Sequence, residues 1–102
     1  MSVTTIKKTD DVRTSILRAA IKYYGTRPQR DKAIEELSEL IRALARCDDS
    51  SNIAEEMADV RIMLDQLEII FHNRDQVRKY EMEKLKRLSD RIHAADTVGV
   101  TL

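Results

Sequence analysis

Apolar residues recur at helical spacing through most of this chain, and few residues interrupt the pattern. The chain contains 2 Gly and 1 Pro, and aromatic residues make up 4% of it, so both turn residues and strand formers are scarce. Charged residues make up 35%, which is typical of long amphipathic helices. The sequence therefore predicts an all-α fold.

Four helical segments are separated by short polar or turn-forming stretches. Gly25 suits the left-handed backbone beyond the first segment, and Pro28 suits the opening turn of the second. Asn52 and Asn73, each followed three residues later by Glu or Gln, suit the caps of the third and fourth segments. We expect helices over residues 10–24, 28–46, 52–71 and 73–94.

The apolar residues of each segment fall on one stripe of the helix, and these stripes define the predicted core. The stripes comprise Val12, Ile16, Ala19, Ala20, Tyr23 and Tyr24 in the first segment, Ala33, Ile34, Leu37, Leu40, Ile41 and Leu44 in the second, Ile53, Met57, Val60, Leu64, Leu67 and Phe71 in the third, and Val77, Leu85, Leu88 and Ile92 in the fourth.

The domain organisation follows from these segments and from the length of the chain. We expect a single helical domain over residues 10–95, with a flexible N-terminal arm (1–9) and a C-terminal tail (96–102). A chain of 102 residues buries only about two thirds of its unfolded surface, and Ile62 and Ile69 make the third segment apolar on a second side. The predicted architecture is a four-helix up-and-down arrangement that associates into a larger helical bundle by oligomerisation.

The charge balance limits the partners of the chain. Lys and Arg together number 18, as do Asp and Glu, so no net field attracts nucleic acid or an anionic membrane. The one cysteine, Cys47, cannot form an internal disulfide, and no apolar stretch has the length of a membrane span or signal segment. We expect a cytoplasmic protein with no nucleic-acid or membrane partner. A nucleophilic role for Cys47 is an alternative, although neither His72 nor His93 lies near it in sequence.

Two pairs of acidic residues occupy consecutive helical segments. Glu36 and Glu39 lie one turn apart beside the apolar stripe of the second segment, and Glu56 and Asp59 lie one turn apart within an apolar face of the third. A carboxylate buried without a partner is costly, so acids on a core-facing surface need a cation or a proton. Acidic residues three apart are also common on solvated helix faces, and the pattern alone leaves that interpretation open.

The chemistry of these side chains indicates the metal. Oxygen ligands without His or Cys favour Mg²⁺, with Mn²⁺ as a substitute, over zinc or copper. The sequence lacks the Glu-x-x-His pairs of di-iron bundles, although His72, four residues after Glu68, leaves that alternative open. The predicted metal ligands are Glu36, Glu39, Glu56 and Asp59.

Two short motifs carry a resemblance to a known family. The segments Glu35-Glu36-Leu37-Ser38-Glu39 and Glu55-Glu56-Met57-Ala58-Asp59 resemble the Glu-x-x-Glu and Glu-x-x-Asp signature of MazG-like nucleoside triphosphate pyrophosphohydrolases. The resemblance extends to Tyr24-Gly25, Gln29, Ala33-Ile34 and residues 59–64, and it covers roughly residues 15–90. One departure is Ala58, where many members of the family have Gly.

The resemblance implies Mg²⁺-dependent hydrolysis of a (deoxy)nucleoside triphosphate to the monophosphate and pyrophosphate, in nucleotide-pool house-cleaning. It implies that Glu36, Glu39, Glu56 and Asp59 bind the metal, and that the chain forms a homodimer or a tetramer built as a dimer of dimers. Glu35 or Glu39 would activate the attacking water. The alternative function is a non-catalytic helical interaction module.

Groups suited to the rest of a nucleotide lie in the second and fourth segments. Lys84, Arg87 and Arg91 follow one flank of the fourth segment and are the predicted phosphate-binding residues. Gln29 is a candidate for hydrogen bonding to the base, with solvation in the first helical turn as its alternative. Tyr80 is the candidate for stacking on the base, and Tyr23, Tyr24 and Phe71 are alternatives. Solvated helix surface is the alternative for the three cations, and ordinary packing is the alternative for the tyrosine.

Overall fold

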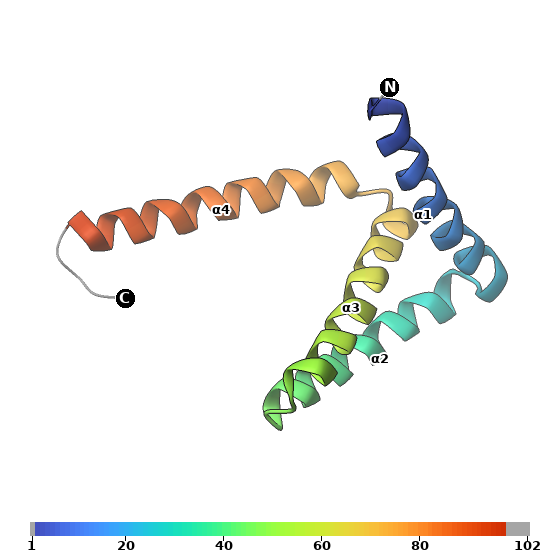
Figure 1. Cartoon of the computed structure of the whole chain (residues 1–102), viewed down its shortest axis with the longest axis horizontal. Coiled ribbons are helices and arrows are strands. Elements are labelled where there is room, and N and C mark those ends of the chain that lie inside the picture. The colour runs from blue at the N-terminus through green and yellow to red at the C-terminus, as the bar shows by residue number, and fades with distance from the viewer. Residues whose placement is uncertain (1, 98–102) are drawn as a thin grey trace. The chain divides into compact units, whose positions relative to one another are not determined.

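The computed structural model describes the backbone of residues 2–97 and the side chains of residues 12–96. The described residues form four α-helices and no strand, which confirms the predicted all-α fold (Figure 1). The helices are α1 (Ser2–Tyr24), α2 (Thr26–Ala45), α3 (Ser50–Phe71) and α4 (Arg74–Thr97). No helix in this part of the chain is long and apolar enough to cross a membrane.

The chain divides into two compact units, Met1–His72 with the first three helices and Asn73–Leu102 with α4. Helix α1 begins at Ser2, so most of the expected N-terminal arm is helical, and α4 continues to Thr97. Residues 98–102 of the expected tail lie outside the described residues. The single domain and the up-and-down arrangement of all four helices stay predictions.

A single glycine joins α1 to α2. Gly25 has a φ of 98°, a conformation that strains any residue with a Cβ, and its N–H donates to the carbonyl of Ile21 at 2.8 Å. Its carbonyl accepts from the N–H of Gln29 at 3.2 Å, which begins the hydrogen bonding of α2. Pro28 falls in the first turn of α2, where its missing N–H costs nothing. The structure confirms the turn role of Gly25 and the helix-opening role of Pro28.

A tight turn reverses the chain between α2 and α3. Cys47 has a φ of 57°, and the side chain of Asp49 accepts from the N–H of Asn52 at 2.9 Å. The prediction that Asn52 caps α3 is wrong, because Asp49 has the extended backbone and the reach of an N-cap residue. The side chain of Asn52 instead donates to Asp48 at 2.6 Å. These bonds hold the closed end of an α2–α3 hairpin.

The end of α3 has a second left-handed residue. His72, with a φ of 51°, follows the last turn of α3 and donates its N–H to the carbonyl of Ile69 at 3.4 Å. Asn73 directly precedes α4, as expected, and its carbonyl accepts from the N–H of Val77 at 2.9 Å. Its Oδ1 accepts no hydrogen bond from the described residues, so the expected side-chain cap is not formed.

Helices α2 and α3 lie side by side and antiparallel, and α1 packs against both (Figure 1). Ala33 and Ala43 of α2 are each 1% exposed, and side chains this small let two helix axes approach closely. An exposed ion pair between Arg13 Nη2 and Asp65 Oδ2, at 2.6 Å, adds a contact between α1 and α3. The buried residues are Gln29, Ala33, Glu36 and Ala43 on α2 and Val60, Met63 and Gln66 on α3.

The predicted core stripes are wrong for most of their large side chains. Ile34 and Ile41 are 64% and 66% exposed, because α2 turns its alanine face toward α3 and its large residues away. Among the described side chains of α1, residues 12–24, the buried one is Leu17, which lies outside the predicted stripe. The predicted core residues that are exposed are Val12, Ile16, Ala19, Tyr23, Tyr24, Ile34, Leu37, Ile41, Leu44, Met57, Leu64, Phe71, Val77, Leu85, Leu88 and Ile92.

Candidate metal centre

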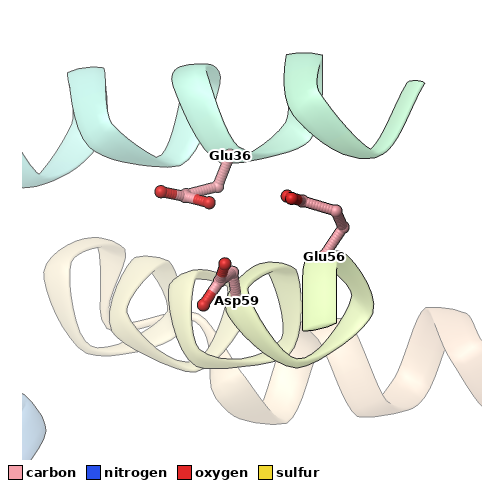
Figure 2. A group of neighbouring side chains, drawn as sticks. All are labelled: Glu36, Glu56 and Asp59. Atoms are coloured by element: carbon pink, nitrogen blue, oxygen red, sulfur yellow. The ribbon is translucent and has the colours of Figure 1, made fainter. Parts of the chain in front are cut away.

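Three carboxylates meet between α2 and α3. Glu36 extends from α2 toward α3, while Glu56 and Asp59 extend from α3 toward α2 (Figure 2). One oxygen from each residue lies within 4.8 Å of the other two. Glu56 and Asp59 are one helical turn apart, so both reach the same level of α2. The structure thus brings together three of the four acids that the sequence indicated, and we call these three the acid cluster.

The burial of the acid cluster differs from the sequence-based expectation. Glu36 is 7% exposed, Glu56 is half-buried, and Asp59 as a whole residue is exposed. The apolar pattern indicated the opposite order, with Glu36 at the border of its stripe. The difference arises because Glu36 lies on the same face of α2 as Ala33 and Ala43, and this face packs against α3.

The oxygens of the acid cluster are only partly satisfied. Lys32, one turn before Glu36 on α2, places its Nζ 3.0 Å from Glu36 Oε1. The other oxygen of Glu36, Oε2, and the Oε2 of Glu56 are buried and accept no hydrogen bond from the described residues. A buried carboxylate oxygen without a partner destabilises the folded chain. Any cation or proton that reaches these oxygens therefore stabilises it.

Burial and mutual repulsion shift the titration of the acid cluster. Burial raises the pKa of Glu56, and the negative charges of Glu39, Asp59 and Glu36 raise it further. Burial also raises the pKa of Asp59, followed by the negative charge of Glu36 and by the hydrogen bond that the two carboxyls form once one of them is protonated, while Lys32 lowers it. Although much of the Asp59 residue is exposed, its carboxylate faces α2 and loses solvent there. Each shift favours the neutral carboxyl in the absence of a cation.

The acid cluster could hold a metal ion. Its donor atoms are all carboxylate oxygens, which suit hard divalent cations. Two oxygens bound to one Mg²⁺ at about 2.1 Å are at most about 4.2 Å apart. Small side-chain rotations are therefore enough to bring oxygens that lie within 4.8 Å of one another into the range of a single ion.

Two further predicted acids lie beside the acid cluster. Glu39 is half-buried and close enough to Glu56 for its charge to raise the pKa of that carboxyl. Glu35 is exposed, and its Oε2 lies 4.0 Å from Lys32 Nζ. The structure therefore places Glu39 at the edge of the cluster and turns Glu35 toward solvent and Lys32.

Gln29, a predicted base contact, lies between α2 and α3. It is buried, and its Nε2 donates to Oε1 of the buried Gln66 at 2.7 Å. A contact of Gln29 with a base stays a prediction.

The predicted phosphate-binding residues share one face of α4. Lys84, Arg87 and Arg91 line an open groove together with the predicted base contact Tyr80. All four residues belong to the second compact unit. Their roles toward a nucleotide stay predictions.

Two residues of the site were missed by sequence reasoning. Lys32 precedes Glu36 by four residues, the spacing at which oppositely charged side chains pair on a helix, and that signal could have identified it. Gln66 follows Asp59 by seven residues, as Gln29 precedes Glu36 by seven. Because these two intervals are equal and the helices are antiparallel, Gln29 lies opposite Gln66 where Glu36 lies opposite Asp59. This correspondence is recognisable only when the facing sides of α2 and α3 are known.

No protein-family model matches the chain, and no significant match exists among curated proteins or solved structures.

The raised pKa of Glu56 predicts how stability depends on pH. A carboxyl whose folded-state pKa lies above its unfolded value contributes stability that is present below the unfolded pKa and is lost as pH rises through the folded pKa. In chelator, Glu56→Gln should therefore melt at a higher temperature than wild type at pH 7. The difference should shrink toward zero as pH falls to about 4, the ordinary range of Glu.

Thermal melts followed by circular dichroism at several pH values measure this difference. Glu83→Gln, at an exposed site on α4, is the control and should follow wild type at every pH. A Glu56→Gln midpoint below wild type at pH 7 in chelator would contradict the electrostatic description of the cluster.

The ion pair of Lys32 predicts an effect on metal binding. Lys32→Gln removes a positive charge that competes for Glu36, so affinity for Mn²⁺ should rise at least about two- to fivefold, the range of an exposed ion pair, because here only the lysine is exposed. Electron paramagnetic resonance of free Mn²⁺ measures the affinity. Lys86→Gln is a matched control, because Lys86 pairs with Asp90 at the same 3.0 Å and the same spacing on α4. Equal affinities in the two variants would contradict this role of Lys32.

Proposed function

We propose that this chain is a Mg²⁺-dependent pyrophosphohydrolase of nucleoside triphosphates, which releases the monophosphate and pyrophosphate. The observation that carries the proposal is the acid cluster itself, in which the buried Oε2 atoms of Glu36 and Glu56 have no hydrogen-bond partner among the described residues. Its oxygen-only donors favour Mg²⁺ or Mn²⁺ over softer metals. The Glu-x-x-Glu and Glu-x-x-Asp motifs that contain these residues resemble those of MazG-like enzymes, and they supply the choice of reaction.

The roles of the residues follow from their positions. Glu36, Glu56 and Asp59 would hold the cation, with Glu39 at the edge of the cluster. When bound, the cation supplies charge neutralisation at phosphate oxygens and a lowered pKa for a bound water. In the reaction, a water oxygen bonds to the α phosphorus and the bond from that phosphorus to the bridging oxygen breaks, so that pyrophosphate leaves.

Of the two acids proposed to activate water, Glu39 fits better than Glu35. Glu39 is half-buried beside Glu56 at the edge of the acid cluster, whereas Glu35 lies on the exposed side against Lys32. Lys32, half-exposed and 3.0 Å from Glu36, offers an ammonium to a phosphate oxygen that approaches the cluster. Lys84, Arg87 and Arg91 keep their proposed phosphate role, and Tyr80 and Gln29 their proposed role toward the base.

Release of pyrophosphate tests the function. Wild type incubated with Mg²⁺ and a panel of ribo- and deoxyribonucleoside triphosphates should form monophosphate and pyrophosphate in equal amounts, and chelator should stop the reaction. Glu36→Gln and Glu56→Gln should each lower kcat/KM at least about 100-fold, because a lost ligand weakens the cation that both water and phosphate need. Glu83→Gln should retain wild-type activity.

The products distinguish this function from its alternatives. Nucleoside diphosphate and inorganic phosphate as products would mean that cleavage occurs between the β and γ phosphates, which would contradict the proposed reaction. Absence of pyrophosphate with every triphosphate would favour the alternative of a non-catalytic helical interaction module.

The proposal includes a homo-oligomer, either a dimer or a dimer of dimers. Four large side chains of α2 follow the 3-4-3 spacing of a coiled-coil seam and are all exposed. They lie away from the alanine face that meets α3. Burying them against a second copy would remove apolar surface that the single chain leaves in water. The residues of this seam are Ile34, Leu37, Ile41 and Leu44.

Sedimentation velocity tests the association. Wild type should sediment with the mass of two or more chains, and Ile41→Lys should shift it toward the monomer by placing a charge in the seam. Met82→Lys on α4 is a matched control, since Met82 and Ile41 are each 66% exposed and Met82 lies outside the seam. A wild-type monomer at micromolar concentration would refute the association.

A further inference from the structure

We propose that the hydrogen bond between Gln29 and Gln66 is a positioning device, which closes the open end of the α2–α3 hairpin and so holds the acid cluster together before a cation binds. The inference rests on the cation-binding part of the proposed function and not on the hydrolysis. It assigns to Gln29 and Gln66 a role that acts through Glu36 and its partners and that needs no contact with a substrate.

The two glutamines form a buried, directional contact between the helices. Gln29 is 8% exposed and Gln66 is 3% exposed, and the distance from Nε2 of the first to Oε1 of the second is 2.7 Å. A buried amide pair stabilises a fold only modestly, but it discriminates strongly between helix alignments, because misalignment leaves both amides unpaired. Polar contacts of this type are suited to fixing how one helix lies against another.

The spacing ties this contact to the acid cluster. Gln29 lies seven residues before Glu36 on α2, and Gln66 lies seven residues after Asp59 on α3. Because the helices are antiparallel, the glutamine level and the acid level are separated by the same two turns, about 10 Å, on both helices. When Gln29 faces Gln66, Glu36 must therefore face Asp59.

The acid cluster needs such a device because it opposes its own assembly. Glu36, Glu56 and Asp59 repel one another, and without a cation this repulsion pushes α2 and α3 apart at the acid level. At one end of the hairpin, the cap of Asp49 on Asn52 fixes the turn. The other end has no covalent turn, and the glutamine pair lies there.

The buried apolar residues of the interface do not set the alignment. Ala33 and Ala43 are small and apolar, and Val60 and Met63 are apolar without directional bonds, so these contacts tolerate sliding. At this open end, between the first turns of α2 and the last turns of α3, the hydrogen bond between the glutamines is the buried directional contact. A second directional contact is at the surface, where the Arg30 guanidinium lies 5.1 Å from the centroid of the exposed Phe71 ring.

Paired substitution separates positioning from stability. In Gln29→Met/Gln66→Met the side-chain volumes are nearly kept and no amide is left unpaired, so the thermal midpoint in chelator should stay the same or rise. Affinity for Mn²⁺ should nevertheless fall about tenfold, the loss expected when groups that orient metal ligands are removed. Gln66→Asn, which keeps the amide but shortens its reach, should also lower the affinity for Mn²⁺.

The alignment itself is measured without a metal. Spin labels on Arg27→Cys and Arg61→Cys, in a Cys47→Ser chain, report the distance between α2 and α3 at exposed positions. In chelator the distance distribution should be broader in the double Met variant than in the parent. Addition of Mg²⁺, which is diamagnetic and would fill the same site as Mn²⁺, should narrow the distribution again. Asp65→Asn, which breaks the exposed Arg13 pair next to Gln66, is the control and should change neither distance nor affinity.

The outcomes distinguish this inference from the proposed function. If wild type binds no divalent cation, the proposed function fails, while the distances in chelator still test the positioning role. If wild type binds Mn²⁺ and the double Met variant binds it equally with an unchanged distance distribution, the positioning role is refuted and the metal site stands. If the double Met variant both melts at a lower temperature than wild type in chelator and binds Mn²⁺ more weakly, the glutamine pair is a structural contact only. This outcome would refute the inference as well.

Discussion

The close contact of α2 with α3 through alanine and polar side chains is the interaction on which the rest of the structure depends. Ala33 and Ala43 are small enough for the helix axes to approach, so the other residues on the same face are brought together whatever their polarity. That proximity pairs Gln29 with Gln66 and buries Glu36 against α3. It also leaves the large apolar side chains of α2 on the opposite face.

This arrangement places electrostatic cost at one level of the hairpin. Glu36 meets Glu56 and Asp59 where solvent is reduced, and Lys32 offsets part of the negative charge. A folded state that carries such a cost is selectively stabilised by whatever relieves it, so binding of a cation and stability of the fold are linked. The same linkage connects the proposed chemistry to the packing. The contact that buries Glu36 raises the free energy of its carboxylate, and a bound cation would lower it again.

Much of the fold and the identity of the acids could be predicted from local patterns. Helical periodicity, Gly25 and Pro28 act within a few residues, so four helices and the first turn were recognisable. The local pattern favours Asn52 as the cap of α3 although Asp49 has that role, since either side chain suits a cap and only the path of the chain distinguishes them. The predicted core is wrong for most of its large side chains, because hydrophobicity alone does not specify that a residue packs within its own chain.

By itself, the sequence determined the all-α class, the positions of the main helix breaks and the presence of paired acids on consecutive helices. The tertiary structure decided which face of α2 meets α3, and with it that Glu36 is the buried acid, that Lys32 neutralises part of its charge, and that Gln66 has a partner. Periodicity is a local property of one helix. The choice of face depends on the size and shape of side chains from two helices at once, which no single helical pattern contains.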